Sequence, residues 1–292
     1  MGDQEAGRGT SEGEKRWLHE ANAAAAVFYR EELLHAAPDW PSEVLERWHV
    51  EEVLDPGSAW SIGYAPDSGT RLIDHLQKQG FGRETLMRAG LMSWTNDRGV
   101  ADRYQDKLVM VSRDRQLDPV GFVGIDRRGQ ATVITPETPV HRPAASLVGV
   151  LEQVDAFKAG AMAVIVDHPL DAIGVQLAVA HARDLRYVGI PLLGAVSQVQ
   201  AQILQQHSEP SRLIVTVAHE VESAELALEN ALELTFAFDE IRVYQRPPGP
   251  LLGNTEQMQI IADLVVSSRS TGPSSDNGHD ATLGNEDPGP SL

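Results

Sequence analysis

The chain has 292 residues, 42% of them hydrophobic, which is enough for a real core in one large domain or two smaller ones. It contains no cysteine, which excludes a disulfide framework and a thiolate zinc site, so zinc is not expected as a cofactor. No run of about 18 apolar residues occurs, and the polar N-terminus lacks the apolar core of a signal peptide. These features predict a cytoplasmic protein with no membrane partner.

The net charge of −18 is unevenly distributed along the chain. Residues 131–292 hold 8 Lys and Arg against 20 Asp and Glu, whereas residues 15–130 hold 15 against 18. A strongly acidic surface repels phosphate backbones unless metal ions intervene. Any surface that binds nucleic acid is therefore expected in the first half of the chain.

The first half of the sequence predicts helices followed by a small sheet. Residues 1–14 are rich in Gly, Glu and Ser without apolar periodicity, which predicts a disordered tail. An apolar stripe predicts a long helix over residues 15–37. Two apolar runs with a polar stretch between them predict a hairpin of strands over 108–112 and 120–125. Shorter helices are expected over 42–50, 71–79 and 84–90, and a third strand over 131–134. Four tryptophans are expected in the core rather than as base-stacking platforms: Trp17, Trp40, Trp48 and Trp60.

Three short apolar runs in the second half have the character of strands buried on both faces of a parallel sheet. They cover residues 163–166, 187–190 and 213–218, and helical segments over 171–182 and 196–206 separate them. This alternation predicts a βαβ series, because parallel strands need crossover connections. In such sheets the chemistry gathers at the carboxyl ends of the strands. Further elements are expected as a helix over 147–159, a helix over 221–236, a strand over 241–244, a helix over 257–266, and a disordered tail over 267–292.

An ordered set of strings resembles the catalytic core of bacterial DnaG-type primases. The matching strings are ANAAAAVFYR (21–30), IGYAP (62–66), IDHLQKQGFGRETLMRAGL (73–91), residues 103–110, residues 121–124 and PETP (136–139). The string DHPLDAI, followed by RYVG, is most similar to toprim modules of actinobacterial plasmid and conjugation proteins. The resemblance covers roughly residues 16–244. It implies an α/β fold, in which an α+β primase-core N-terminal subdomain (15–159) is followed by a toprim domain (160–266) with a Rossmann-like parallel sheet.

The resemblance also implies a magnesium site made of one Glu after the first toprim strand and a DxD pair after the third. Asp167 stands at the Glu position, His168 replaces the Gly that follows it, and Asp171 is retained. The DxD positions are His219 and Val221. Magnesium prefers hard oxygen ligands, and phosphoryl transfer depends largely on metal electrostatics and positioning. These substitutions predict a primase-core protein that is catalytically degenerate. An intact site would use Mg²⁺ as its cofactor, and the substituted ligands argue against Mg²⁺ binding in this chain.

An alternative keeps an active, divergent primase that makes RNA primers on single-stranded DNA. Glu220 and Glu222 form an ExE pair one residue later than the expected DxD, and with Asp167 and Asp171 they would supply four carboxylates to a shifted metal site. The competing interpretation is structural. Asp171 would cap a helix, and the two glutamates would start the next helix, where carboxylates suit the positive end of the helix dipole.

The region over residues 98–128 is locally basic, with 7 Lys and Arg against 5 Asp. Arg103 and Lys107 match cations of the primase motif, and Arg113, Arg127 and Arg128 accompany them. This predicts contact with single-stranded DNA or another nucleic acid, against the alternative of a solvated surface with ion pairs. The predicted role is in DNA replication or in plasmid or conjugative DNA processing, with replication or conjugation proteins as partners. A third hypothesis is a protein-interaction module that does not bind DNA.

Overall fold

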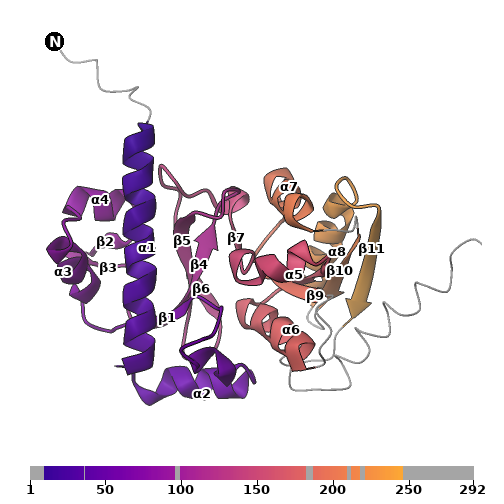
Figure 1. Ribbon diagram of the computed structural model, residues 1–292, viewed down its shortest axis with the longest axis horizontal. Coiled ribbons are helices and arrows are strands. Elements are labelled where there is room, and N and C mark those ends of the chain that lie inside the picture. Colours follow the sequence, from indigo (N-terminus) through magenta and orange to yellow (C-terminus); the bar gives the residue numbers. More distant parts are fainter. Residues whose placement is uncertain are drawn as a thin grey trace, which may run out of the picture.

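The computed structural model describes residues 10–35, 37–95, 99–181, 187–208, 212–217 and 221–245. These residues form two α/β units that lie side by side, an N-terminal unit and a parallel-sheet unit (Figure 1). The predicted helix over 257–266 and the predicted tail over 267–292 lie outside the described residues. No helix among the described residues is both long and apolar enough to span a membrane.

The N-terminal unit is built on an antiparallel sheet in the order β1-β4-β5-β6, with the short strand β7 paired to β4. The predicted hairpin and third strand are confirmed as β4, β5 and β6. The strands are β1 (Ile62–Ala65), β4 (Lys107–Arg113), β5 (Pro119–Ile125), β6 (Ala131–Ile134) and β7 (Leu147–Val148).

Helix α1 (Glu12–His35) lies along this sheet and contacts β1 and β5 (Figure 1). A Cβ atom on Gly63 would lie 2.5 Å from the carbonyl carbon of Tyr29, so the glycine of IGYAP allows α1 to pack directly on β1. Helix α1 begins at Glu12, inside the range predicted as a disordered tail. Further elements surround α1 and the sheet: α2 (Asp39–Arg47), η1 (Glu51–Leu54), α3 (Arg71–Lys78), α4 (Arg83–Arg88), and the hairpin β2 (Met92–Thr95) and β3 (Gly99–Asp102), which was not predicted.

The parallel-sheet unit confirms the predicted βαβ series. Its strands are all parallel and follow the order β11-β10-β8-β9. Its elements are α5 (Val154–Lys158), β8 (Met162–Val166), α6 (Pro169–His181), β9 (Tyr187–Pro191), α7 (Gln198–His207), β10 (Arg212–Val217), α8 (Val221–Leu234) and β11 (Glu240–Gln245).

The prediction of one helix over 147–159 is wrong. Leu147 and Val148 pair with β4, Gly149 has φ 86°, and two 3₁₀ turns, η2 (Pro143–Ala145) and η3 (Leu151–Gln153), flank the strand β7. A positive φ is incompatible with a continuous right-handed helix, so only the end of the range, α5, is α-helical.

The two units share one apolar core. Alternate residues of β8 point to opposite faces of the sheet, so Val164 packs with α6 and the N-terminal unit, whereas Ile165 packs with α5, α7 and α8. Trp60 from the N-terminal unit lies in the same cluster as Val164. Of the tryptophans predicted in the core, Trp40 and Trp60 are buried, whereas Trp17 is 41% exposed and packs against Phe81.

Candidate active site and nucleic-acid interface

The turn between β8 and α6 carries two of the predicted metal ligands. Asp167 follows the last residue of β8 and is half-buried, and Asp171 lies in the first turn of α6 with only 2% of its surface exposed. A carboxylate in the first helical turn is stabilised by the helix dipole. The structure therefore brings Asp167 and Asp171 to one turn at the carboxyl end of the sheet, as expected for a parallel α/β unit.

His168 fixes this turn to the N-terminal unit. Its ring stacks on Trp48 with a centroid separation of 4.0 Å and an interplanar angle of 16°. Nδ1 accepts a hydrogen bond of 3.1 Å from the backbone N–H of Leu170, which places the ring proton on Nε2, and Nε2 donates to the carbonyl oxygen of Gly129. The imidazole that replaces the glycine of the primase motif thus fills the junction between the two units.

Of the remaining predicted ligands, Glu222 belongs to the described residues. Glu222 is in the first turn of α8 and is exposed, and Val221 is the first residue of that helix. Glu220 and His219 lie outside the described residues. The position of Glu222 agrees with the interpretation that this acidic residue begins a helix.

Two of the five predicted nucleic-acid residues are used inside the protein. The guanidinium of Arg103 donates from Nε to the carbonyl oxygen of Gly90 at 2.7 Å and from Nη2 to that of Met92 at 3.1 Å. Arg113 donates to the carbonyl oxygen of Leu117 at 3.1 Å. These contacts hold Arg103 at the start of the β2–β3 hairpin and Arg113 at the β4–β5 loop.

Arg113 also forms an ion pair with Glu152. Their charged atoms are 3.7 Å apart, and the two side chains are only 11% and 3% exposed. Burial raises the pKa of the Glu152 carboxyl, and the positive charge of Arg113 opposes that rise. The pair connects β4 to η3, the segment that leads into the parallel-sheet unit.

Two of the other three basic residues, Lys107 and Arg127, contact Asp106. Arg127 pairs with the Asp106 carboxylate at 2.8 Å, and its guanidinium lies 5.6 Å from the ring centre of Trp40, while Lys107 donates to the Asp106 carbonyl oxygen at 3.2 Å. Burial acts to raise the pKa of Asp106, but the hydrogen bond and charge of Arg127, together with hydrogen bonds from Trp40 and Tyr64, lower that pKa overall. Arg127 nevertheless remains 62% exposed, and Arg128 is exposed as well.

The loop over residues 126–130 presents these arginines beside the β8–α6 turn. The Asp126 carboxylate accepts the backbone N–H groups of Arg128 at 2.9 Å and Gln130 at 3.0 Å, which shapes the turn. Gly129 in the same loop has φ 82° and accepts the hydrogen bond from His168. Two exposed arginines are thus held next to the turn that carries Asp167 and Asp171.

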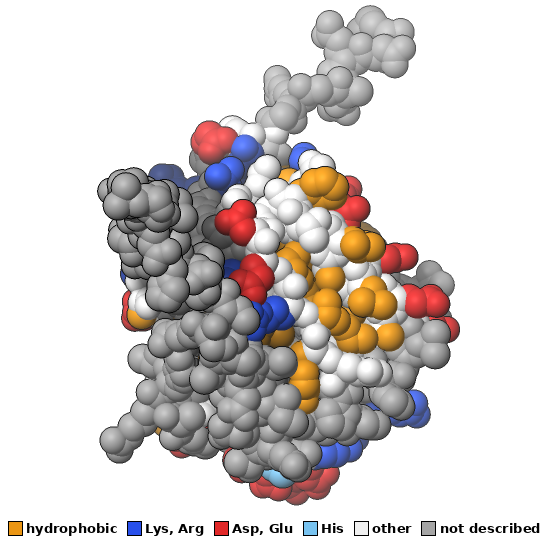
Figure 2. Space-filling model, turned by 90° about the vertical axis from the view of Figure 1, so that its right-hand side faces the viewer, with side chains coloured by type: hydrophobic (Ala, Val, Ile, Leu, Met, Phe, Trp, Pro, Cys, Tyr) orange, Lys and Arg blue, Asp and Glu red, His pale blue; other side chains and the backbone are white. Residues whose placement is uncertain are grey.

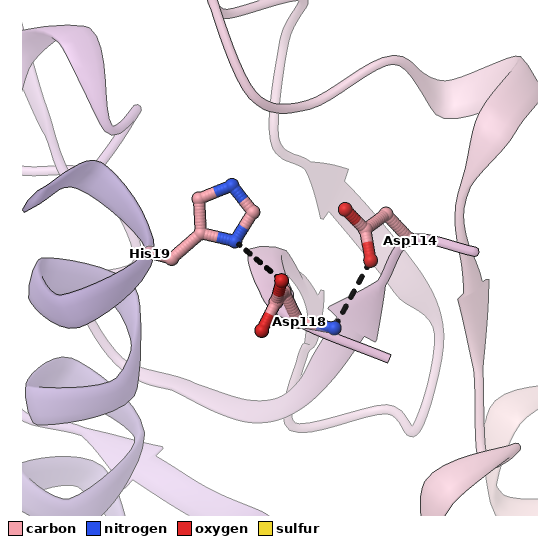
Figure 3. A group of neighbouring side chains, drawn as sticks. All are labelled: His19, Asp114 and Asp118. Atoms are coloured by element: carbon pink, nitrogen blue, oxygen red, sulfur yellow. Dashed lines mark hydrogen bonds and ion pairs between the residues drawn. The ribbon is translucent and has the colours of Figure 1, made fainter. Parts of the chain in front are cut away.

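A second acidic cluster, which sequence reasoning missed, lies between α1 and the β4–β5 loop (Figure 3). His19, Asp114 and Asp118 each offer a ligand atom, and these atoms lie within 4.8 Å of one another. His19 Nδ1 is 3.5 Å from the Asp118 carboxylate. Asp114 accepts the backbone N–H groups of Gln116 at 2.9 Å and Asp118 at 3.0 Å. These contacts explain the cluster as a fastening of the loop to α1, at one wall of a cleft of about 1090 Å³.

The comparisons with known proteins agree with this architecture. Residues 44–153 match the family model described as "DNA primase catalytic core, N-terminal domain". A structure of the DnaG primase catalytic domain bound to single-stranded DNA superposes with a TM-score of 0.69 at 19% identity, covering 88% of this chain and 80% of that one. The chain has the fold of the DnaG primase catalytic core.

Further proteins are similar to this chain. The RNA polymerase domain of Mycobacterium tuberculosis primase DnaG, in complex with double-stranded DNA, gives a TM-score of 0.66 at 23% identity over 88% of this chain and 81% of that one. The DNA primase of Synechococcus elongatus is 26% identical over 260 residues, which are 84% of this chain and 36% of that protein. The DNA primase of Mycolicibacterium smegmatis is 34% identical over 176 residues, 57% of this chain and 26% of that protein. The chain therefore spans about a third of the Synechococcus primase and about a quarter of the Mycolicibacterium primase.

Proposed function

We propose that this primase-core homologue binds nucleic acid in DNA replication or in plasmid or conjugative DNA processing, and that its metal-dependent nucleotidyl transfer is impaired. The observation that carries the second part is the His168 ring, which occupies the glycine position of the motif and is held by Trp48 and Gly129. These contacts fix the turn to the N-terminal unit, so it lacks the backbone freedom that a glycine gives the motif at this position.

The acidic residues that the structure describes fit a magnesium ion poorly. Mg²⁺ demands near-octahedral oxygen ligands and usually keeps several waters, whereas Asp171 is 2% exposed. Asp167 has one methylene group fewer than the Glu of the motif, which shortens its reach. At the DxD positions the sequence offers the imidazole of His219 and the isopropyl group of Val221, and neither is a hard oxygen ligand.

Support for nucleic-acid binding comes from charge and from the relatives. Primase domains with this fold have been solved with single-stranded and with double-stranded DNA. Of the four arginines predicted to contact nucleic acid, Arg127 and Arg128 are exposed, whereas Arg103 and Arg113 are engaged by internal carbonyl oxygens. We therefore assign phosphate contacts to the 126–130 loop and structural roles to Arg103 and Arg113.

Primer synthesis tests the catalytic part of the proposal. The chain is incubated with a single-stranded template, ribonucleotides and either Mg²⁺ or Mn²⁺, beside a variant that restores the motif (Asp167→Glu, His168→Gly, His219→Asp, Val221→Asp). We expect no products above background from the natural chain and no heat on titration with Mg²⁺, and measurable Mg²⁺ binding by the restored variant. Robust primer synthesis by the natural chain would overturn the proposal that nucleotidyl transfer is impaired, and would favour the alternative of an active, divergent primase.

A gel-shift assay on single-stranded DNA at several salt concentrations tests the binding part. Because each phosphate contact contributes about 0.7 to the slope of log K against log salt for single strands, Arg127→Ala with Arg128→Ala should flatten that slope by roughly 1 to 2. Lys158→Ala is the matched control, because Lys158 is an exposed cation on α5 in the other unit. Binding that is absent, or equally reduced in the control, would favour the protein-interaction module.

A further inference from the structure

Helix α8 carries an apolar stripe on its outer side. Leu228 and Leu232 on α8 are 49% and 69% exposed, and Phe236, in the turn that directly follows the helix, is 85% exposed. The two leucines are four residues apart and lie one above the other on a helical face. Figure 2 shows hydrophobic side chains gathered on this side of the molecule, with acidic side chains around them. Single exposed leucines are common on protein surfaces, but a continuous apolar stripe that ends in a phenylalanine indicates a binding surface.

The opposite side of α8 already supplies the contacts that hold the helix in the fold. Ala227, Ala231 and Leu234 are buried against the parallel sheet. Beside the outer stripe, a cavity of about 250 Å³ opens between α7 and α8, and Phe236 and Ala201 line it. Helix α8 therefore has a second apolar face that its packing on the sheet does not use, and this face lies next to a cavity that can accept a side chain.

We propose that the segment over residues 257–266 of the same chain docks on this stripe. Strand β11 ends at Gln245 and, like β10, contacts α8. Residues 246–256 link it to the segment and at about 3.3–3.6 Å per residue can reach up to about 40 Å. Helix α8, with 14 residues at about 1.5 Å each, is only about 21 Å long. The segment can therefore reach any point of the stripe.

The sequence of the segment matches this surface. Met258, Ile261, Leu264 and Val265 have the spacing of one helical stripe, and Asp263 falls on the opposite side, between Ile260 and Val266. The rest of the C-terminal sequence offers no comparable stripe, since residues 267–292 contain only two large aliphatic residues, Leu283 and Leu292. A helix formed by residues 257–266 would thus cover the apolar side chains of α8 with its own and keep its carboxylate outward.

Charge favours this occupant over a second copy of the chain. Glu225, Glu229 and Glu233 border the stripe on α8 and are exposed. Two copies packed through the stripe would bring these carboxylates together, and like charges across an interface oppose association.

The absence of cysteine in the chain makes pairwise cross-linking the direct test. Leu232→Cys is combined in turn with Met258→Cys, Ile261→Cys or Leu264→Cys, and with Thr282→Cys as the control from residues 267–292. A disulfide requires Cα atoms within about 7 Å. We expect intramolecular cross-linking at least tenfold faster in one of the first three pairs than in the control. Equal rates in all pairs, or products that are mainly intermolecular, would overturn the proposal.

Hydrogen exchange in the full-length chain gives a second readout. Ile261→Asp places a charge in the proposed contact and should raise the exchange of α8 amides, whereas Gln259→Asp adds the same charge on the outer side and should not. Circular dichroism confirms that both variants stay folded. Exchange that rises equally in both variants, or in neither, contradicts the docking.

Discussion

Replacing Arg113 by methionine separates a structural role from a DNA-binding role for this residue. The substitution keeps much of the aliphatic volume and removes the charge that faces Glu152 at 3.7 Å. Because the Glu152 side chain is only 3% exposed, the variant would leave a carboxylate buried without its counter-charge.

The expected loss of stability follows from two contacts. Breaking a buried ion pair by removing one partner costs about 3–5 kcal/mol, and the lower end applies here because the two charges are 3.7 Å apart. The hydrogen bond from Arg113 to the Leu117 carbonyl oxygen adds about 1 kcal/mol. We therefore expect Arg113→Met to lower the free energy of unfolding by about 4 kcal/mol.

Urea unfolding at neutral pH measures this loss, and a cycle with Glu152→Gln isolates the pair. The double variant should be more stable than Arg113→Met alone, because the neutral amide is less costly to bury than a carboxylate. In Arg113→Met the stability should also recover as the pH falls. Burial raises the pKa of Glu152, so the folded state binds this proton more tightly than the unfolded state and gains stability on protonation. An Arg113→Met protein that is as stable as the natural chain but binds DNA less well would refute the structural assignment.

Three further predictions concern the packing of the fold. Asp102 is buried, and burial raises its pKa to about 6 against the opposing effect of hydrogen bonds from backbone N–H groups at the start of α3. The pKa of Asp102 is higher in the folded than in the unfolded state, so the stability that this carboxyl contributes falls as the pH rises from about 4 to 6. In urea unfolding, Asp102→Asn should not show this loss of stability between about pH 4 and 6. Gly63→Ala should cost about 1–3 kcal/mol, because its Cβ would meet α1 at 2.5 Å, whereas Gly57→Ala, with open space around it, should cost little; thermal unfolding of both compares them. His168→Ala should lose about 1–3 kcal/mol in urea unfolding, because the ring stack on Trp48 and two hydrogen bonds disappear, and an unchanged midpoint would contradict the contact at this junction.

The sequence alone determined the parallel sheet and its place in the chain. The segments that form β8, β9 and β10 are apolar on both sides, because helices and the N-terminal unit cover both faces of the sheet. A continuous apolar run of this kind can be identified from the sequence alone. The strings that resemble the primase core are also short contiguous segments, so they could be identified without the structure. The hairpin of β2 and β3 escaped prediction, because strands of four residues carry little periodicity.

The tertiary structure decided what the individual charges do. Sequence reasoning grouped Arg113 with Arg128 because both lie in a basic stretch, but folding brings Glu152 to the first and leaves the second exposed. His168 follows the same logic, because Trp48 and Gly129 reach it from distant positions in the chain. The sequence gives the charge of a residue, whereas its partner is set by contacts between residues far apart in the chain, which form only when the chain folds.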